Sequence, residues 1–287
     1  MLKFNKNLSI IHAYLCADGY VIKNPETQKH KYYHIGLRNT NCVLLKDFQK
    51  RFEEFFGVKP HITNEGRCRI QNKKIYEFLT KDFSYYSREW SLPDLSKDNL
   101  RYWLRAFFDC EGWVLVKKAK NRHIGSDSVN HNGLRQIQEG LERFIIKSKI
   151  KILNNRDISR LLIYGKENLV KFQKEIDFLH PDKKKKLQEA IDSYADYNWN
   201  FPKDKEKLKV YIINFINKRT KIDKAFRIRI CSNSEKNVVS LSQHLKNLFR
   251  VDSKVYGPKF NGIGTMFYEL TIHKKEDVNK CKELFRL

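Results

Sequence analysis

The chain has 287 residues, and its 57 lysines and arginines against 33 aspartates and glutamates give a formal net charge of +24. A chain of this length is too long for one small domain and suggests about two domains. A large excess of positive charge indicates which partners the protein binds and does not indicate its fold. The natural partner is a polyanion, with nucleic acid as the leading candidate. A general lysine bias of the host and an anionic membrane surface are the weaker alternatives.

The cysteines and the apolar runs exclude several further classes of protein. The six cysteines are widely spaced, with no CxxC pair and no zinc-like cysteine–histidine cluster, so we expect small buried thiols in a reducing compartment. The amino terminus lacks the apolar core of a signal peptide, and no apolar run approaches the ~20 residues of a membrane span. We therefore expect an intracellular protein without membrane contact, in the cytoplasm or nucleoid, or in an organelle of a eukaryote.

Residues 8–18 have helical spacing and end in an acid that is followed by a glycine. Ala13 and Ala17 lie four apart and share one face, where small side chains let another backbone approach. Gly19 suits the C′ position that ends a helix. Asp18 is then badly placed, because a helix C-terminus repels negative charge by about 0.3–1 kcal/mol. A broken local rule of this kind points to function; the alternative is a solvated Asp-Gly turn.

The same pattern returns at residues 101–112, where Ala106 and Cys110 repeat the small face and Glu111-Gly112 repeats the acid and glycine. After each motif the hydrophobic periodicity predicts a hairpin, a long amphipathic helix, a second hairpin and at least one closing helix. The predicted strands are residues 20–23, 31–38, 61–64, 67–71, 113–118, 122–128 and the hairpin 150–164, which turns at Asn154-Asn155. The predicted helices are residues 42–56, 73–81, 131–148, 166–178 and 182–193, the last beginning with a lysine run, residues 183–186, that is most simply a solvated face.

A third copy of the pattern follows a linker at residues 195–205. It is predicted to contain helices at residues 208–218, 236–249 and 274–285 and strands at 226–230 and 266–273. Each copy has a pair of polar anchors where a strand gives way to the long helix, in the order Asn39-x-Asn41, Ser128-x-Asn130 and Ser232-x-Ser234. The third copy has Lys218 where the acid would be, which indicates a degenerate repeat without catalysis.

These patterns predict an α+β fold of two αββαββα domains, residues 1–97 and 98–195, related by a pseudo-twofold axis. A degenerate ββαββα repeat at residues 205–287 is predicted to be an accessory nucleic-acid-binding domain. If the two motif helices pack side by side, Asp18 and Glu111 lie close together. Two close carboxylates repel unless they share protons or hold a divalent cation, and their hard oxygens suit Mg²⁺.

The two motifs, IHAYLCADG at residues 11–19 and LRAFFDCEG at residues 104–112, resemble those of the LAGLIDADG homing endonucleases in their single-chain, two-motif form. The resemblance covers residues 8–193, and the segment FLHPDKKKKL is similar to the family's closing helix region. It implies a monomer whose two four-stranded sheets lie on the major groove of a long, specific site in double-stranded DNA. It also implies a mobile element or intron as the source of the chain, and cleavage of both DNA strands with Mg²⁺ or Mn²⁺.

The resemblance also implies roles for individual residues. Asp18 and Glu111, with the motif glycines Gly19 and Gly112, would form the metal site. Arg38 occupies the place of the family's basic helper in the first half, whereas Asp127 or Ser128 occupies it in the second, where Lys117 or Lys118 would substitute. The residues expected to contact DNA are basic: Lys23, His34, Arg38, Arg67, Arg69, Lys118, Arg122, Arg160, Arg227 and Arg229.

Two other functions fit the same residues. One is an intron maturase, because a basic sheet face serves structured RNA as well as DNA. The other is a DNA-binding protein of the same fold that has lost cleavage, although the presence of both acids and both glycines argues against it. Purely structural helices are the remaining alternative, and these would not need an acid at two helix ends.

Overall fold

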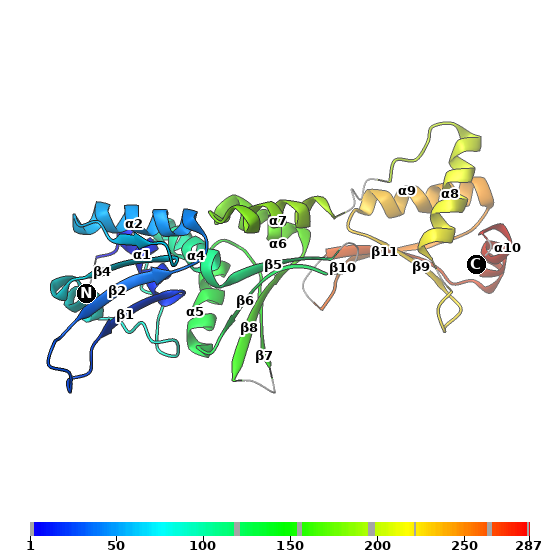
Figure 1. The fold of residues 1–287 in the computed structure, drawn as a ribbon. Helices are drawn as coiled ribbons and strands as arrows, with labels where there is room; N and C mark the ends of the chain where they lie inside the picture. Colours follow the sequence, from blue (N-terminus) through cyan, green and yellow to red (C-terminus); the bar gives the residue numbers. More distant parts are fainter. Residues whose placement is uncertain are drawn as a thin grey trace. The chain divides into compact units, whose positions relative to one another are not determined.

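The computed structural model describes residues 3–117, 121–153, 157–194, 199–220, 222–262, 266–285 and 287, shown in Figure 1. The chain divides into two compact units, Met1–Tyr194 and Ala195–Leu287. No helix in these described ranges is long and apolar enough to cross a membrane. All six cysteines are free, and Cys42 and Cys231 are exposed, which corrects the expectation that every thiol is buried.

The first unit contains the αββαββα pattern twice, which confirms the predicted α+β fold. The first repeat consists of α1 (Lys6–Cys16), β1 (Gly19–Lys23), β2 (Tyr33–Arg38), α2 (Cys42–Phe56), β3 (His61–Thr63), β4 (Arg67–Gln71) and α3 (Lys73–Thr80). The second consists of α4 (Lys97–Glu111), β5 (Gly112–Lys117), β6 (Asn121–Ser128), α5 (His131–Glu142), β7 (Lys149–Leu153), β8 (Ile158–Tyr164), α6 (Lys166–Glu175) and α7 (Pro181–Asp192). The antiparallel sheets have the equivalent orders β1-β2-β4-β3 and β5-β6-β8-β7.

Local sequence explains where the long helix of each repeat begins and ends. The Asn41 side chain accepts a hydrogen bond from the Val43 N–H at the start of α2, and Gly57 ends the helix in the left-handed conformation, with φ 70°. In the second repeat the helix predicted over 131–148 ends at Glu142. The chain turns at Ile145, which has φ 59°, and this non-glycine turn gave no signal in the sequence.

Helices α1 and α4 pack against each other and run in the same direction. Near their starts, Asn99 Nδ2 donates to the Phe4 carbonyl at 3.1 Å. One to two turns further on, Trp103 Nε1 donates to His12 Nδ1 at 3.1 Å. The predicted interface residues Ala13 and Ala106 are fully buried. Because the helices are parallel, their C-terminal ends meet at the same end of the seam.

The second unit has its own core and a three-stranded sheet. Its elements are α8 (Lys205–Arg219), β9 (Ile228–Ser232), α9 (Glu235–Phe249), β10 (Lys254–Phe260), β11 (Met266–Ile272) and α10 (Lys275–Phe285). The sheet order β10-β11-β9 matches β3-β4-β2 of the first repeat. The predicted ββαββα pattern is therefore wrong at its start: before β9, the described residues contribute only an isolated bridge between Ile222 and Ile228, so no counterpart of β1 is present among them.

The first polar anchor has the same local structure in all three copies, whereas the second caps its helix at Asn41 and Asn130 but makes no side-chain cap hydrogen bond at Ser234. In each, the side-chain oxygen of the first anchor accepts a hydrogen bond from the N–H two residues later. The hydrophobic residue four positions after the second anchor, Leu45, Leu134 or Val238, is buried in each case. From β9 onward, the second unit thus has the same order of strands and helices as the two other copies.

Candidate active site and nucleic-acid interface

The two motif acids lie at the shared C-terminal end of the α1–α4 seam. Glu111 is the last residue of α4, and Asp18 lies between the end of α1 and the start of β1. Both side chains are half-buried. Asn39 Nδ2 donates to Asp18 Oδ2 at 2.7 Å, and the Cys110 thiol lies close enough to the same carboxylate for its negative charge to raise the thiol pKa, after burial as the larger cause. These contacts orient Asp18 toward the end of the partner helix.

The electrostatics of Glu111 reflect this arrangement. The pKa of Glu111 is raised to about 7, first by burial and then by the negative charge of Asp18, while the positive charge of Lys183 opposes the shift. One motif carboxylate therefore feels the charge of the other, as expected for acids that converge on one point. A divalent cation between them would stabilise both ionised forms.

The motif glycines are required for space, not for a left-handed turn. Neither Gly19 nor Gly112 has a positive φ, which corrects the expectation that Gly19 is a C′ terminator. A Cβ on Gly19 would lie 2.4 Å from Leu15 Cα, and one on Gly112 would lie 2.4 Å from the Phe108 carbonyl oxygen. The strand that follows each acid thus passes directly over the last turn of the helix that precedes it, and no side chain fits between them.

Helix α7 fixes the end of α4 on which Glu111 lies. Lys183 Nζ donates to the carbonyl oxygens of Phe108, Asp109 and Cys110 at 3.3, 2.6 and 2.9 Å. In return, the Asp109 carboxylate accepts hydrogen bonds from the backbone N–H groups of Leu179 and His180, which directly precede α7, each at 2.9 Å. The prediction that Lys183 belongs to a solvated face is therefore wrong: this lysine caps a buried helix end.

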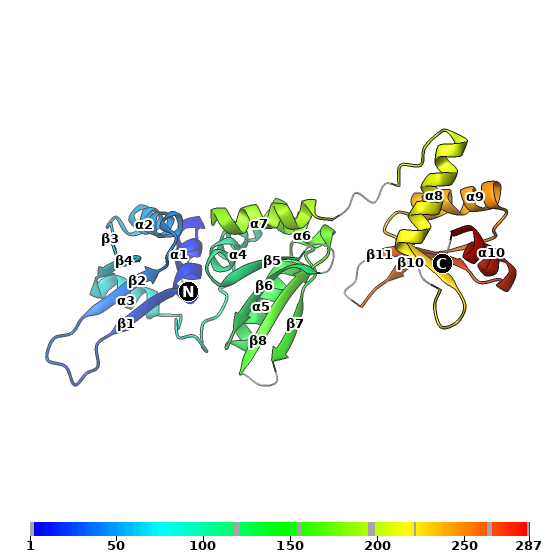
Figure 2. The same cartoon turned by 45° about the vertical axis from the view of Figure 1, so that its right-hand side comes forward.

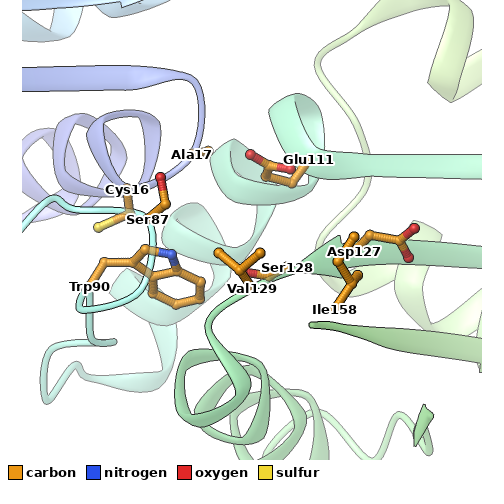
Figure 3. Close-up of a pocket in the computed structure, with 9 residues that line it drawn as sticks. All are labelled: Cys16, Ala17, Ser87, Trp90, Glu111, Asp127, Ser128, Val129 and Ile158. Atoms are coloured by element: carbon orange, nitrogen blue, oxygen red, sulfur yellow. The ribbon is translucent and has the colours of Figure 1, made fainter. Parts of the chain in front are cut away.

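A cavity of about 230 Å³ opens beside Glu111. Figure 3 shows Glu111 on the last turn of α4 and Asp127 on the neighbouring strand β6. The cavity is lined by Cys16, Ala17, Ser87, Trp90, Glu111, Asp127, Ser128, Val129 and Ile158. The cavity lies between the end of α1 and the second repeat, and the carboxylates of Glu111 and Asp127 line it, so its surroundings are acidic where the first repeat has Arg38.

Strand register places the predicted basic residues of the first repeat on the exposed face of its sheet. Arg38 pairs with Arg67, Gly36 with Arg69, and His34 with Gln71, so His34, Arg38, Arg67 and Arg69 share one face. The alternate residues of the same strands are in the core. Lys23 does not join them: it has the strand parity of buried Val21, and its ammonium pairs with Glu26 at 3.3 Å.

In the second repeat, Asp127 occupies the register position of Arg38. Asp127 pairs with Arg160 across β6 and β8, and the two form a bidentate ion pair with both N···O distances at 2.7 Å. The Arg160 guanidinium also lies 5.4 Å from the centre of the Trp113 ring. Arg160 is thus on the expected face, but its charge is partly neutralised.

Three other predicted contacts have different surroundings. Arg122 lies on the opposite face, since it pairs with Val116, and its guanidinium binds the hydroxyl and carbonyl oxygens of Ser193 at 2.5 and 2.8 Å. In the second unit, Asp223 forms ion pairs with Arg227 at 3.2 Å and with Arg229 at 3.1 Å. These arginines are therefore structural at least in part.

The two predicted second-half substitutes for the helper are not placed. Lys118 lies outside the described residues, and of Lys117 only the backbone, at the end of β5, is described. Sequence reasoning missed Lys149 and Lys151, which lie on the same face as Arg160 because Lys151 pairs with it across β7 and β8. The alternation Lys-Ile-Lys-Ile at residues 149–152 was the available signal.

The donor set at the seam suits a hard cation. Within the described part of the chain, no group of three or more His, Cys, Asp or Glu residues is arranged to hold a metal ion. The protein thus offers two carboxylates, Asp18 and Glu111, whose mutual repulsion a divalent cation would relieve. Mg²⁺ and Mn²⁺ accept such oxygen ligands and complete their shells with water and phosphate oxygens.

Residues 98–177 match the family described as LAGLIDADG-like domain. This range begins at the first turn of α4, includes Glu111 and ends after α6, and the first repeat has the same topology. The chain therefore contains a LAGLIDADG-like domain. Among curated LAGLIDADG relatives, homing endonuclease I-ApeI of Aeropyrum pernix is 29% identical over 150 residues, which are 48% of this chain and 67% of that protein.

Other similar proteins match over different extents. The glutamine–fructose-6-phosphate aminotransferase of Methanocaldococcus jannaschii is 29% identical over 214 residues, which are 68% of this chain but only 19% of that protein. Among solved structures, I-DmoI in complex with DNA and Ca has a TM-score of 0.47 at 18% identity, covering 64% of this chain and 99% of that one. I-WcaI bound to its DNA recognition sequence has a TM-score of 0.43 at 15% identity, covering 65% and 88%.

Proposed function

We propose that this chain is a site-specific endonuclease that cleaves both strands of double-stranded DNA, with a divalent cation held by Asp18 and Glu111. The observation that carries the proposal is the meeting of the two motif acids at one end of a parallel helix pair, where the charge of Asp18 raises the pKa of Glu111. A pair of acids in a purely structural seam would cost stability without return.

The residues of the chain have distinct roles in this reaction. A bound divalent cation would supply Lewis-acid polarisation of the scissile phosphodiester and activation of water. Asn39 holds one carboxylate in place through its 2.7 Å hydrogen bond to Asp18, and Lys183 holds the backbone that carries the other. Arg38, exposed at the end of β2, stabilises the charge that develops on the phosphate.

The two exposed sheet faces bind the DNA on either side of the acids. Arg38, Arg67 and Arg69 on the first face, and Lys151 on the second, contact phosphates and base edges of the major groove. Since one chain contains both repeats, a monomer suffices for both strands. The curated relative I-ApeI is itself named a homing endonuclease, which supports the proposal, as does the net charge of +24.

The experiment that tests this proposal is selection of cleaved molecules from a library of randomised duplex sites, with Mg²⁺, Mn²⁺ or EDTA. We expect recovery of one long site that is cut in both strands only with the divalent cation. Specific binding of duplex DNA without cutting would instead indicate a cleavage-silent protein, and binding of folded intron RNA without cutting would indicate a maturase.

A further inference from the structure

The second unit has an open sheet face with a cavity in it. Residues of α8, α9 and α10 form one core with the inward side chains Ile228, Ile230, Leu270 and Ile272. The alternate residues of the strands face away from these helices. On that face lies a cavity of about 390 Å³, lined by Arg227, Tyr256, Lys259, Glu269, Thr271 and His273.

A β-bulge assembles this cavity. Tyr256 pairs with Glu269, and the register then shifts so that Lys259 pairs with Phe267. Without the extra residue, Lys259 would lie on the opposite face from Tyr256, because successive side chains alternate. With it, Lys259 Nζ lies 3.0 Å from Glu269 Oε1 and 5.1 Å from the centre of the Tyr256 ring. The bulge thus gathers a cation, a carboxylate and an aromatic ring.

The lining has the chemistry of a nucleotide site. The Tyr256 side chain is 42% exposed, and an exposed aromatic ring offers a stacking surface for a base. Arg227, Lys259 and His273 can bind a phosphate. The Glu269 carboxylate and the Thr271 hydroxyl, which donates to Glu269 at 3.1 Å, can accept hydrogen bonds from a base edge. The volume falls within the range of small-molecule sites. Lysines and arginines outnumber aspartates and glutamates in residues 195–287.

We propose that this cavity binds a nucleotide of single-stranded nucleic acid, with its base on Tyr256 and its phosphate on Arg227 and Lys259. A paired duplex presents its bases edge-on and stacked, so it cannot insert one into a cavity or against a ring. The site is separate from the motif acids and so goes beyond the proposed cleavage.

The test uses the full chain in EDTA, so that binding is measured without cleavage and independently of the proposed endonuclease. Fluorescein-labelled oligo(dT) and oligo(rU) are titrated with wild type, Tyr256→Leu and Lys259→Ala. One stacked base is worth about 1–3 kcal/mol, so we expect Tyr256→Leu to weaken single-strand binding about tenfold. The two oligonucleotides distinguish DNA from RNA as the preferred source of the nucleotide.

The matched control is Lys246→Ala, which removes one exposed positive charge from α9, on the helical side of the same unit. We expect it to weaken binding less than Lys259→Ala does, and we expect all variants to retain wild-type affinity for a random duplex. Thermal melting of each variant reports folding, and Tyr256 is exposed enough for leucine to be tolerated. If Tyr256→Leu binds both oligonucleotides like wild type, or if Lys259→Ala and Lys246→Ala are equal, the proposal is wrong.

Discussion

At the scale of single residues, the two halves of the candidate active site are unequal. Arg38 and Asp127 occupy the same register position, opposite Arg67 and Arg160 respectively. The first repeat therefore presents two cations beside its acid, whereas the second presents a neutralised ion pair. If the chain cleaves DNA as proposed, the reacting phosphates of the two strands would therefore meet different local environments.

Arg38→Ala tests the role assigned to this residue. Loss of one preorganised cation at a reacting phosphate costs about 10²–10³ in rate, so we expect one strand to be cut about a hundredfold more slowly. Nicked DNA should then accumulate in a plasmid assay. Arg69 lies on the same sheet face but on β4, which is one strand further than β2 from β1, the strand that follows Asp18. Arg69→Ala should therefore weaken binding without producing a nicked intermediate. Equal slowing of both strands by Arg38→Ala would show that it serves no single strand.

Lys183→Met tests the cap on α4. The variant loses the charged hydrogen bonds to the Phe108, Asp109 and Cys110 carbonyls, and we expect the free energy of unfolding to fall by about 2 kcal/mol. Cleavage should fall more than DNA affinity, because the displaced residue is Glu111. Lys185→Met, an exposed lysine of the same helix, is the control for lost charge and should be neutral in chemical denaturation and in cleavage.

His12 makes the seam sensitive to acid. Burial lowers the pKa of His12 to about 3 from its usual 6.5, so the unfolded chain binds a proton that the folded chain does not. The resulting stability is fully present above pH 6.5 and is lost as the pH falls toward 3, at about 1.4 kcal/mol per pH unit.

The His12→Leu variant isolates this effect. Its absolute stability should be lower, since Trp103 Nε1 loses its acceptor, but its stability should fall less steeply between pH 6.5 and 5 than that of wild type. Denaturant titrations at several pH values measure both slopes. Identical slopes would mean that His12 titrates alike in the folded and unfolded chain, and would contradict the lowered pKa.

At the scale of elements, the sequence predicted most helices and strands of the first unit, because amphipathic periodicity and polar caps are local signals. It also predicted the pairing of the two acids from their repetition. The tertiary contacts of buried polar groups could not be predicted in the same way. Lys183 lies in a run of four lysines, and only the packing of α7 on the end of α4 determines which of the four contacts the buried carbonyls. Likewise, the sheet face on which Lys23 and Arg122 lie depends on the strand register. A shift of one residue in the predicted strand moves each side chain to the opposite face.

Gly112→Ala tests the close passage of β5 over α4. The added methyl would lie 2.4 Å from the Phe108 carbonyl oxygen, so we expect a loss of about 1–3 kcal/mol in the free energy of unfolding. Gly140→Ala in α5 is the control, since its methyl would meet the Leu100 and Leu92 side chains at ordinary contact distances of 3.4 and 3.6 Å, and alanine favours the helix by up to about 1 kcal/mol. A stable Gly112→Ala protein would mean that the strand can move away from the helix without cost.

At the scale of the whole molecule, one scaffold occurs three times and the acids occur twice. In Figure 2, as in Figure 1, α6 and α7 lie along one side of the β5–β8 sheet. By strand register, Lys151 and Arg160 share the face that also carries Asp127. The third copy keeps the anchors and the core but has Lys218 instead of the acid, and its described residues have no counterpart of β1. Loss of that strand and loss of the acid belong together, because in the other copies the strand begins at the motif glycine.

The central claim is that Asp18 and Glu111 form one catalytic centre, and the direct measurement is cleavage of the selected DNA site by acid variants. We expect Asp18→Asn and Glu111→Gln each to abolish cutting with Mg²⁺ or Mn²⁺ while duplex binding stays within about threefold of wild type, and the double variant to behave like either single one. Asp98→Asn, which changes an exposed acid at the other end of α4, should cleave normally. Cutting by the double variant at the wild-type rate would contradict the account.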